Sequence, residues 1–225
     1  MSEFQHISVL LNEAIAALNI QSNGIYVDGT FGRGGHSSEI LKQLDTGHLI
    51  SIDRDPTAKA CADKIFANHK NFTFYAGCMS EIEQAVLRSG IDKVDGVLLD
   101  IGVSSPQLDD AERGFSFMKD GPLDMRMNPN SGISAAEWVA HSDFETMTKV
   151  FRDYGEERFA ARIANHIIKH RELSPILTTH DLANLVSDAL PFKDKHKHPA
   201  TRVFQAIRIA INEELTELSK TLQAA

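Results

Sequence analysis

A glycine-rich segment near the start of the chain carries residue types suited to holding a small ligand. The segment DGTFGRGGH, residues 28–36, follows a short apolar run and precedes a helix-like stretch. Glycines let a ligand approach the backbone closely, and the first N–H groups of the following helix are available to an acceptor. A second apolar run ends in Asp53, where a carboxylate can accept hydrogen bonds from a ribose. Together these features predict a nucleoside-containing cofactor.

The spacing of the glycines distinguishes between two nucleoside-containing cofactors, NAD(P) and S-adenosylmethionine. The NAD(P) fingerprint G-x-G-x-x-G requires a third glycine where Ser37 stands, so the match is poor. S-Adenosylmethionine (SAM) has a ribose and an adenine but no pyrophosphate. A SAM site needs a glycine-rich turn after the first strand and an acid after the second, without that strict spacing. The segment therefore favours SAM, and a tight turn in an unrelated α/β protein is the alternative.

A second segment, LLDIGVSSPQ at residues 98–107, suggests what is done with the cofactor. Methyl transfer to a ring amino group needs the nitrogen lone pair in line with the departing sulfur, and polar acceptors for the amine hydrogens help to orient it. Amino-directed methyltransferases place a short polar-Pro segment after the fourth strand, where Ser104-Ser105-Pro106 stands. A turn capped by serine hydroxyls is the alternative.

The first hundred residues alternate between strand-like and helix-like segments. This alternation predicts a parallel sheet with helices on both faces, with a ligand bound beyond the carboxyl ends of the strands. Three acids, Asp28, Asp53 and Asp100, close predicted strands at those ends. The predicted strands are 25–28, 49–53, 72–75 and 94–100, and the predicted helices are 9–18, 37–44, 56–68 and 80–89.

The second half of the chain is predicted to be helical. Residues 102–133 lack periodicity but contain apolar side chains, which indicates an ordered functional loop. We expect residues 1–105 and 201–225 to form the core, and residues 106–200 to form a helical insert. Helices are predicted over 134–140, 143–151, 156–170, 179–190 and 201–222, with Ser134 and Thr178 or Thr179 as N-caps.

Composition narrows the class of protein. The chain has 225 residues with 42% hydrophobic and 24% charged side chains, as in an ordinary globular protein, and we expect no membrane span. Cys61 and Cys78 are too few for a disulfide framework, which favours a reduced cytoplasmic setting. The formal net charge is −8, yet residues 149–208 hold 11 Lys or Arg against 7 Asp or Glu. A local basic face for nucleic acid and solvated helix faces are both compatible with that distribution.

Several long segments resemble the bacterial 16S ribosomal RNA cytosine-N4 methyltransferase family. They lie between residue 6 and about residue 214, and they include GTFGRGGHS, IDRDP, LLDIGVSSPQLDDAERGFSF, DGPLDMRM, YGEERFA and KHPATRVFQAIRI. The resemblance implies SAM-dependent N4-methylation of a cytidine in the decoding region of 16S rRNA in the small ribosomal subunit. It also implies a Rossmann-like class I methyltransferase core with an inserted all-helical domain, which would recognise the RNA.

The resemblance also assigns residues by their place in these motifs. Asp124 and Arg126 would line the target-base pocket, and the family usually has an aromatic residue where Met79 stands. The implied cofactor residues are Gly34, Gly35, His36, Asp53, Met79, Asp100 and Gln107. The positioning residues for catalysis would be Asp100, Ser104, Ser105 and Pro106. Apart from the resemblance, the basic residues Lys193, Lys195, Lys197, His198 and Arg202 predict a phosphate-contacting patch, and a solvated loop is the alternative. His166 and His170 have a metal-binding spacing but no third ligand, so we predict no metal.

The predicted sheet is incomplete. Only four strands precede the insert, and the last predicted helix is followed by no strand, whereas the resembled family continues with further strands. We expect the fourth strand to expose an edge, with weaker stability and impaired catalysis relative to a longer relative, unless a second copy covers that edge in a homodimer. The alternative functions are a non-catalytic SAM-binding or ribosome-binding remnant and, more distantly, a nicotinamide-dependent dehydrogenase.

Overall fold

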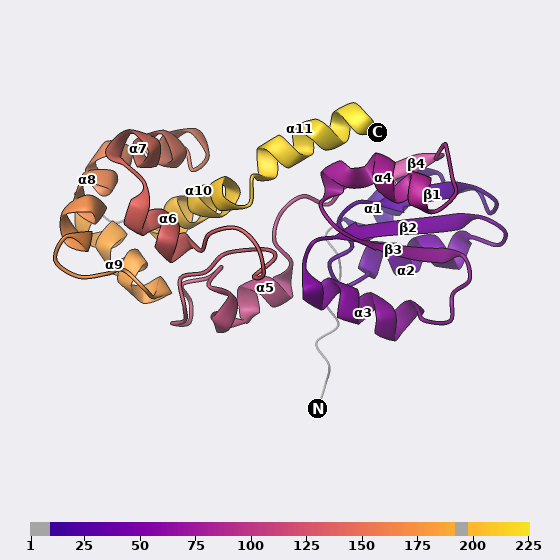
Figure 1. Cartoon of the computed structure of the whole chain (residues 1–225), viewed down its shortest axis with the longest axis horizontal. Coiled ribbons are helices and arrows are strands. Elements are labelled where there is room, and N and C mark those ends of the chain that lie inside the picture. The colour runs from indigo at the N-terminus through magenta and orange to yellow at the C-terminus, as the bar shows by residue number, and fades with distance from the viewer. Residues whose placement is uncertain (1–9, 192–197) are drawn as a thin grey trace. The chain divides into compact units, whose positions relative to one another are not determined.

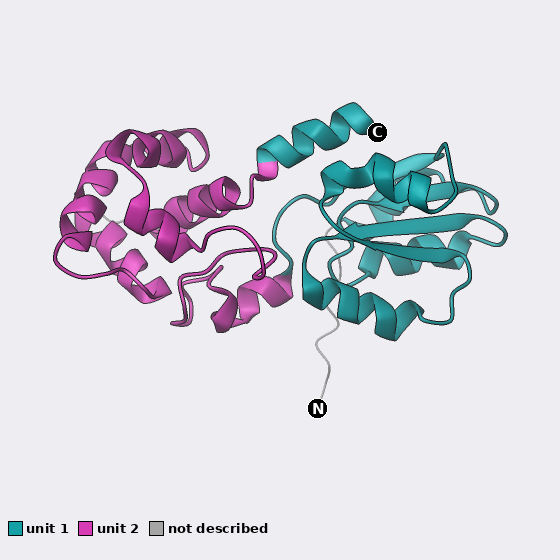
Figure 2. Cartoon of the chain, viewed as in Figure 1, with its two compact units in different colours: residues 1–104, 215–225 teal, residues 105–214 magenta. Residues whose placement is uncertain are grey.

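The computed structural model describes residues 10–191 and 198–225. The chain divides into two compact units (Figure 2). Unit 1 comprises Met1–Ser104 with Leu215–Ala225, and unit 2 comprises Ser105–Glu214. The expected insert ended at residue 200, whereas residues 201–214 lie in unit 2.

Unit 1 is built on a four-stranded parallel sheet, as the alternation of strands and helices predicts. The strand order is β3-β2-β1-β4, which leaves β3 and β4 at the edges within the described part of the chain. In the register, Val27 pairs with Ile50 on one side and with Val97 on the other. The strands are β1 (Ile25–Asp28), β2 (His48–Asp53), β3 (Phe72–Ala76) and β4 (Gly96–Leu98).

Helices cover both faces of this sheet (Figure 1). Side chains alternate along each strand, so Tyr26 and Leu49 pack into the core formed with α2 and α3, while Val27 and Ile50 pack into the core formed with α4. The helical elements of unit 1 are α1 (Leu11–Leu18), α2 (Gly35–Gln43), α3 (Pro56–Phe66), the 3-10 turn η1 (Met79–Glu81), α4 (Ile82–Arg88) and α11 (Glu214–Ala224).

Unit 2 is helical. Helix α8 packs between α7 and α9, and α10 packs on α6 and α7. The side chains that are fully buried at these contacts include Met147, Phe151, Ile163, Ile167 and Leu182. The helical elements are α5 (Ser105–Asp109), η2 (Ala111–Arg113), α6 (Ala135–His141), α7 (Phe144–Asp153), α8 (Ala160–Arg171), α9 (Thr179–Ala189) and α10 (Thr201–Ile211).

The helix starts in unit 2 follow the capping rules that the sequence shows. Ser134 and Glu137 form a capping box at α6, and Thr178 and Asp181 form another at α9. Both predicted N-caps are therefore confirmed. In the described ranges of the chain, no helix combines the length and the apolar composition needed to cross a membrane.

Two predicted elements differ from the structure. The last helix, expected over residues 201–222, is two helices, because Asn212 ends α10 and Glu213 adopts a left-handed φ of 52°. Strand β4 is shorter than the predicted 94–100. Residues 102–133 also contain α5 and η2, and within them Leu123 and Met125 are buried while Met118 is 82% exposed.

Candidate active site

The glycine-rich turn is tied to the end of the neighbouring strand. The backbone N–H of Gly32 donates a hydrogen bond of 2.8 Å to Asp53 Oδ2, and the N–H of Asp55 donates one of 2.9 Å to Oδ1. Gly34 then begins α2 as its N-cap with a φ of 79°, a left-handed conformation that glycine adopts without strain. The turn and Asp53 are thus brought together, as the sequence predicts.

Asp28, at the end of β1, lies inside the fold. Its side chain is fully buried, and Oδ2 accepts a hydrogen bond of 2.6 Å from the Ser37 hydroxyl, which lies 2.8 Å from the Ser51 hydroxyl. Oδ1 accepts one of 3.1 Å from the N–H of Thr30. Burial raises the pKa of Asp28, and the bonds from Ser37 and Thr30 oppose that rise. Asp28 therefore holds the turn through buried hydrogen bonds, and its carboxylate is not accessible from the surface.

Asp53 has a different environment. Part of the residue is exposed to solvent. Burial of its carboxyl group among protein atoms nevertheless raises the pKa of that group to about 6. The hydrogen bonds from Asp55 and Gly32 lower that pKa, while the charges of Asp55 and Asp28 raise it. The end of the sheet is therefore an acidic region, in which a positive group is stabilised.

The side chains of His36 and Asp100 lie close to one another. His36 is 5% exposed at the start of α2, and its Nδ1 lies 3.9 Å from Asp100 Oδ2. The N–H of Asp100 donates a hydrogen bond of 2.7 Å to Thr30 Oγ1, which places the residues after β4 against the turn after β1. His36 Nε2 is buried without a hydrogen-bond partner in the described residues. A buried imidazole nitrogen of this kind is suited to a polar ligand atom.

Met79 also lies at this end of the sheet. A methyl group added to Gly29 would lie 3.8 Å from Met79 Cβ. The Met79 side chain is partly exposed, so its thioether can cover a flat apolar ring. Gly34, Gly35, His36, Asp53, Met79 and Asp100 are thus all residues of unit 1 at or beyond the carboxyl ends of the strands.

The remaining predicted residues of this site continue along the chain. Ser104 ends unit 1, and Ser105, Pro106 and Gln107 lie in α5 of unit 2. The Gln107 side chain is 8% exposed. Because a helix begins at Ser105, the segment is the start of a helix and not an isolated turn.

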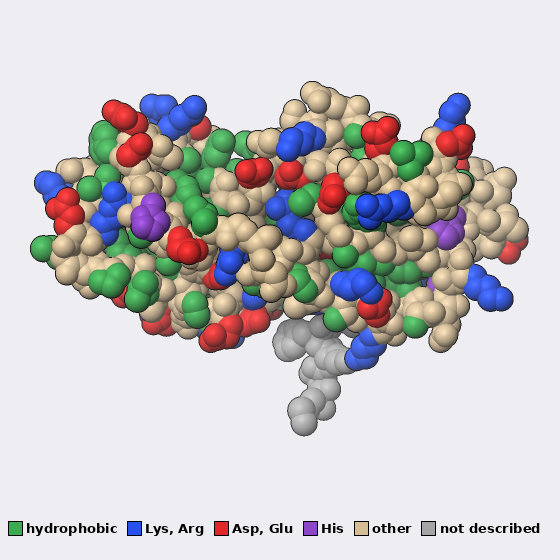
Figure 3. Space-filling model, in the orientation of Figure 1, with side chains coloured by type: hydrophobic (Ala, Val, Ile, Leu, Met, Phe, Trp, Pro, Cys, Tyr) green, Lys and Arg blue, Asp and Glu red, His purple; other side chains and the backbone are tan. Residues whose placement is uncertain are grey.

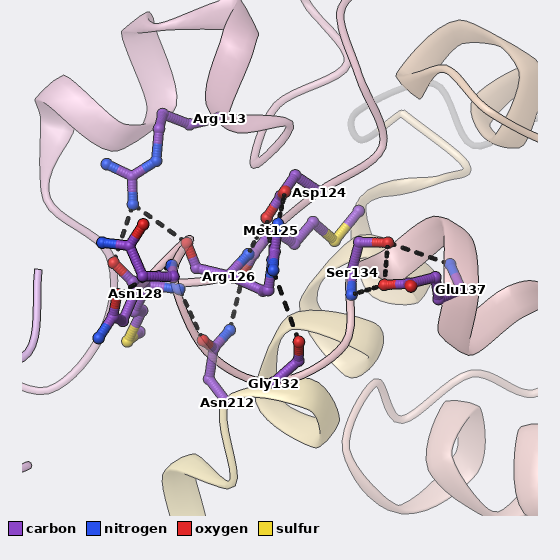
Figure 4. Close-up of polar contacts among 11 residues, drawn as sticks. Arg113, Asp124, Met125, Arg126, Asn128, Gly132, Ser134, Glu137 and Asn212 are labelled. Carbon is purple, nitrogen blue, oxygen red and sulfur yellow. Dashed lines mark hydrogen bonds and ion pairs between the residues drawn. The ribbon is translucent and has the colours of Figure 1, made fainter.

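The loop that contains Asp124 is held by a set of buried and part-buried polar contacts in unit 2 (Figure 4). Asn212 Oδ1 accepts a hydrogen bond of 2.7 Å from the N–H of Met127, and its Nδ2 donates one of 2.8 Å to the carbonyl of Met125. From the other side, Arg113 Nη2 donates to the carbonyls of Arg126 and Met127 at 3.0 and 2.9 Å. Met125 is fully buried with a φ of 59°. These bonds hold the loop in a conformation that is unfavourable for an isolated residue.

The Asp124 carboxylate is paired with Arg126. The guanidinium donates from Nε to Oδ1 at 2.9 Å and from Nη2 to Oδ2 at 2.6 Å, which is a bidentate arrangement. Burial alone would raise the pKa of Asp124, but the hydrogen bonds from the Arg126 side chain and backbone lower it below its ordinary value. Asp124 is therefore held ionised and is a weak proton acceptor.

The predicted RNA-binding patch is only partly described. Lys193, Lys195 and Lys197 lie outside the described residues. The exposed His198 ring stacks on Phe117 with a centroid distance of 4.4 Å, and the exposed Arg202 donates from Nη1 to the carbonyl of Glu156 at 3.1 Å. On the face drawn in Figure 3, Lys and Arg side chains are interspersed with Asp and Glu.

His166 and His170 belong to α8. Across residues 10–191 and 198–225, no group of three or more His, Cys, Asp or Glu side chains is arranged to hold a metal ion.

Several residues that hold the site together are not among those predicted from the sequence. Thr30, Ser37 and Ser51 bind the acids at the strand ends, and Asn212 and Arg113 hold the loop around Met125. Thr30 and Ser37 belong to the GTFGRGGHS motif, which was a usable signal for them. For Ser51 and Asn212 the sequence held no such signal, because their partners lie far away in the chain.

The sheet order, the glycine-rich turn and the acids beyond it define a Rossmann-like methyltransferase core with an additional helical unit. The chain belongs to the MraW methylase family, whose model matches residues 3–225. MraW methylases are in general SAM-dependent enzymes. The chain is also similar to two proteins named ribosomal RNA small subunit methyltransferase H, from Shewanella loihica and Shewanella violacea. Each is 54% identical over 225 residues, which covers 99% of this chain and 72% of the relative.

Proposed function

We propose that this chain transfers a methyl group from SAM to N4 of a cytidine in the decoding region of 16S rRNA, within the small ribosomal subunit. Membership of the MraW methylase family supports methyl transfer, and the names of the two Shewanella relatives support a small-subunit RNA substrate. The choice of a cytidine amino group rests on the polar-Pro segment at residues 104–106 and on the resemblance of the sequence motifs.

The acidic surroundings of the glycine-rich turn are the observation that supports SAM for this chain. Asp53 has a pKa raised to about 6, first by burial and then by the charges of Asp55 and Asp28. Arg33, the cation inside the turn, donates to the carbonyl of Thr57. Ser37, which stands in place of the third glycine of the G-x-G-x-x-G pattern, disfavours the pyrophosphate of a nicotinamide cofactor. A sulfonium cofactor without phosphate would be attracted to the carboxylates.

The chain's own residues would bind and orient the two reactants. The Asp53 carboxylate, fixed by the N–H groups of Gly32 and Asp55, would accept hydrogen bonds from the ribose hydroxyls, and the Met79 thioether would cover the adenine. SAM supplies the electrophilic methyl group when it is bound. Oxygen atoms of residues 104–106 would accept the amine hydrogens and direct the nitrogen lone pair. We assign no general base, because Arg126 holds Asp124 in a weakly basic state.

Transfer of labelled methyl from SAM to unmethylated small ribosomal subunits tests this proposal, with nucleoside mass spectrometry to identify the product. We expect N4-methylcytidine in the decoding region. Calorimetric titration should show binding of SAM and S-adenosylhomocysteine, and no binding of NADH. SAM binding without methyl transfer would contradict the enzymatic proposal and favour a non-catalytic SAM-binding or ribosome-binding role. A product methylated elsewhere would contradict the choice of N4.

A further inference from the structure

The start of α8 carries two arginines whose positions oppose the local rules of helix stability. Arg158 precedes the helix, and Arg162 is the third residue of its first turn. A helix N-terminus has a partial positive charge, so cations there are unfavourable, and like charges four residues apart add a further cost. No acidic residue stands in the first turn of α8, whereas α6, α7 and α9 have Glu137, Glu145 and Asp181 there.

Other cations of unit 2 have evident structural roles. Arg171 donates to the carbonyls of Val139 and Ser142 at 2.6 and 2.7 Å, and Arg208 makes a bidentate pair with Glu214. Lys169 lies in the last turn of α8, where a cation is favourable. By contrast, Arg158 and Arg162 are exposed, and neither guanidinium forms an ion pair or hydrogen bond within residues 10–191 and 198–225.

The acidic groups nearest in sequence do not neutralise these arginines. Glu157 is 6% exposed, and its Oε1 accepts a hydrogen bond of 2.8 Å from the N–H of Phe159. Glu156 is exposed with a φ of 51°, and its carbonyl accepts from Arg202. Helix α8 itself contains no Asp or Glu.

The start of α10 lies beside the start of α8 in unit 2. The carbonyl of Arg202 comes so close to Gly155 that a methyl group there would lie 2.5 Å from it. Arg202 also donates to the carbonyl of Glu156 at 3.1 Å. These two contacts place Arg202 at the turn that leads into Arg158 and Arg162. The three exposed arginines, Arg158, Arg162 and Arg202, therefore lie near the turn at residues 155–156.

We propose that Arg158, Arg162 and Arg202 form a phosphate-contacting surface for the RNA substrate, here called the α8 arginine surface. This inference rests on the proposed function, because it assumes an RNA substrate and names how it is held. Guanidinium groups bind phosphate oxygens through paired N–H donors, and such contacts position a nucleic acid without reading its sequence. The placement of two unpaired arginines at an unfavourable helix end is typical of a site where function outweighs local stability.

The test compares two double variants that remove the same charge. Arg158→Gln with Arg162→Gln alters the α8 arginine surface, whereas Lys42→Gln with Lys59→Gln removes two exposed lysines of unit 1 that pair with Glu39 and Asp63. Binding to a protein-free transcript of the decoding region is measured across a series of salt concentrations. The logarithm of the binding constant falls linearly with the logarithm of the salt concentration, and each lost phosphate contact makes this slope less negative by about 0.7 to 0.9.

We expect the arginine variant to bind the transcript roughly tenfold more weakly at low salt, with a slope less negative by about 1 to 2. The lysine variant should match the wild type. The double variant Arg158→Lys with Arg162→Lys should keep the wild-type slope, because it keeps the charge. The arginine variant should bind SAM as the wild type does and melt at the same or a slightly higher temperature, since it removes cations from a helix N-terminus.

Equal affinity and slope for the arginine and lysine variants would overturn the α8 arginine surface, as would a fall in melting temperature that accounts for the weaker binding. A wild-type chain that binds the transcript but methylates no subunits would contradict the proposed function alone. A wild-type chain that neither binds the transcript nor methylates small subunits would overturn both proposals.

Discussion

The N–H of Gly32 donates a 2.8 Å hydrogen bond to the carboxylate of Asp53, which lies 21 residues further along the chain. This bond joins the turn after β1 to the end of β2. The carboxylate that is proposed to hold the ribose is therefore positioned by the same turn that lets the cofactor approach. A change in either residue should alter the cofactor site.

Replacing Asp53 with Ala should weaken SAM binding by roughly 1–3 kcal/mol, because a polar partner of the ribose is lost. Titration calorimetry with purified protein measures this change. Lys59→Gln, on an exposed face of α3, serves as the control and should leave the affinity unchanged. Unaltered affinity in Asp53→Ala would remove Asp53 from the cofactor site.

SAM binding should weaken as the pH falls through about 6. The folded-state pKa of Asp53 is raised to about 6 from 3.8, chiefly by burial, so the folded protein binds this proton before the unfolded chain does. Protonation removes a hydrogen-bond acceptor from the site, while it favours the folded state increasingly between about pH 6 and pH 4. Calorimetry at a series of pH values measures the affinity. Asp53→Asn removes the titrating carboxyl and leaves the raised pKa of Asp28 in place, so the affinity of this variant should depend less on pH. The same pH dependence in the variant and the wild type would assign the titration to another group.

Gly34→Ala should destabilise unit 1 and weaken SAM binding. The residue has a φ of 79°, which costs a non-glycine residue about 1–2 kcal/mol, and the new methyl group would lie 2.8 Å from Phe31 Cζ. Gly90→Ala is a matched control, because Gly90 has a φ of 74° but open space around its Cα. Urea unfolding of both variants isolates the effect of packing. An equal loss of unfolding free energy in the two variants would show that the Phe31 ring moves aside without an energetic cost.

Ser37→Ala should lower the free energy of unfolding by about 1–3 kcal/mol, because it removes a donor to the fully buried Asp28 carboxylate. Ser38→Ala is the neighbouring control. Ser38 Oγ donates to the carbonyl of Gly34, which keeps its bond from the Ser38 N–H. Thermal and urea unfolding should therefore show a clearly smaller loss for Ser38→Ala, and the reverse order would contradict the role given to Ser37.

Asn212→Ala should destabilise unit 2 and reduce methyl transfer while SAM affinity stays unchanged. The substitution leaves the part-buried N–H of Met127 and the buried carbonyl of Met125 without their side-chain partner, and the buried carbonyl alone costs roughly 1–3 kcal/mol. Replacement of the exposed Asn130 by Ala is the control and should be neutral. Unfolding curves and labelled-methyl transfer are the measurements; a variant as active and stable as the wild type would rule out this role for Asn212.

Much of the fold could be predicted from the sequence, because its signals are local. Short apolar runs predicted β1 and β2, and Ser134 and Thr178 predicted the starts of α6 and α9. The cofactor turn could be located because glycines and an acid at a strand end form a short pattern. The break between α10 and α11 could not be predicted, since it depends on the Asn212 side chain bonding to a loop 85 and 87 residues away.

The sequence by itself determined the parallel sheet, the turn from Asp28 to His36 and the family, because each depends on neighbouring residues or contiguous motifs. Only the tertiary structure decided what the individual acids and arginines do. In the tertiary structure, Asp28 is buried against Ser37 and Ser51. Asp53 stays partly accessible and has a raised pKa. Arg126 and Arg208 form ion pairs, whereas Arg158 and Arg162 are unpaired among the described residues. The physical reason is that burial and hydrogen-bond partners come from segments that are distant in the chain, so residues of one type acquire different chemistry.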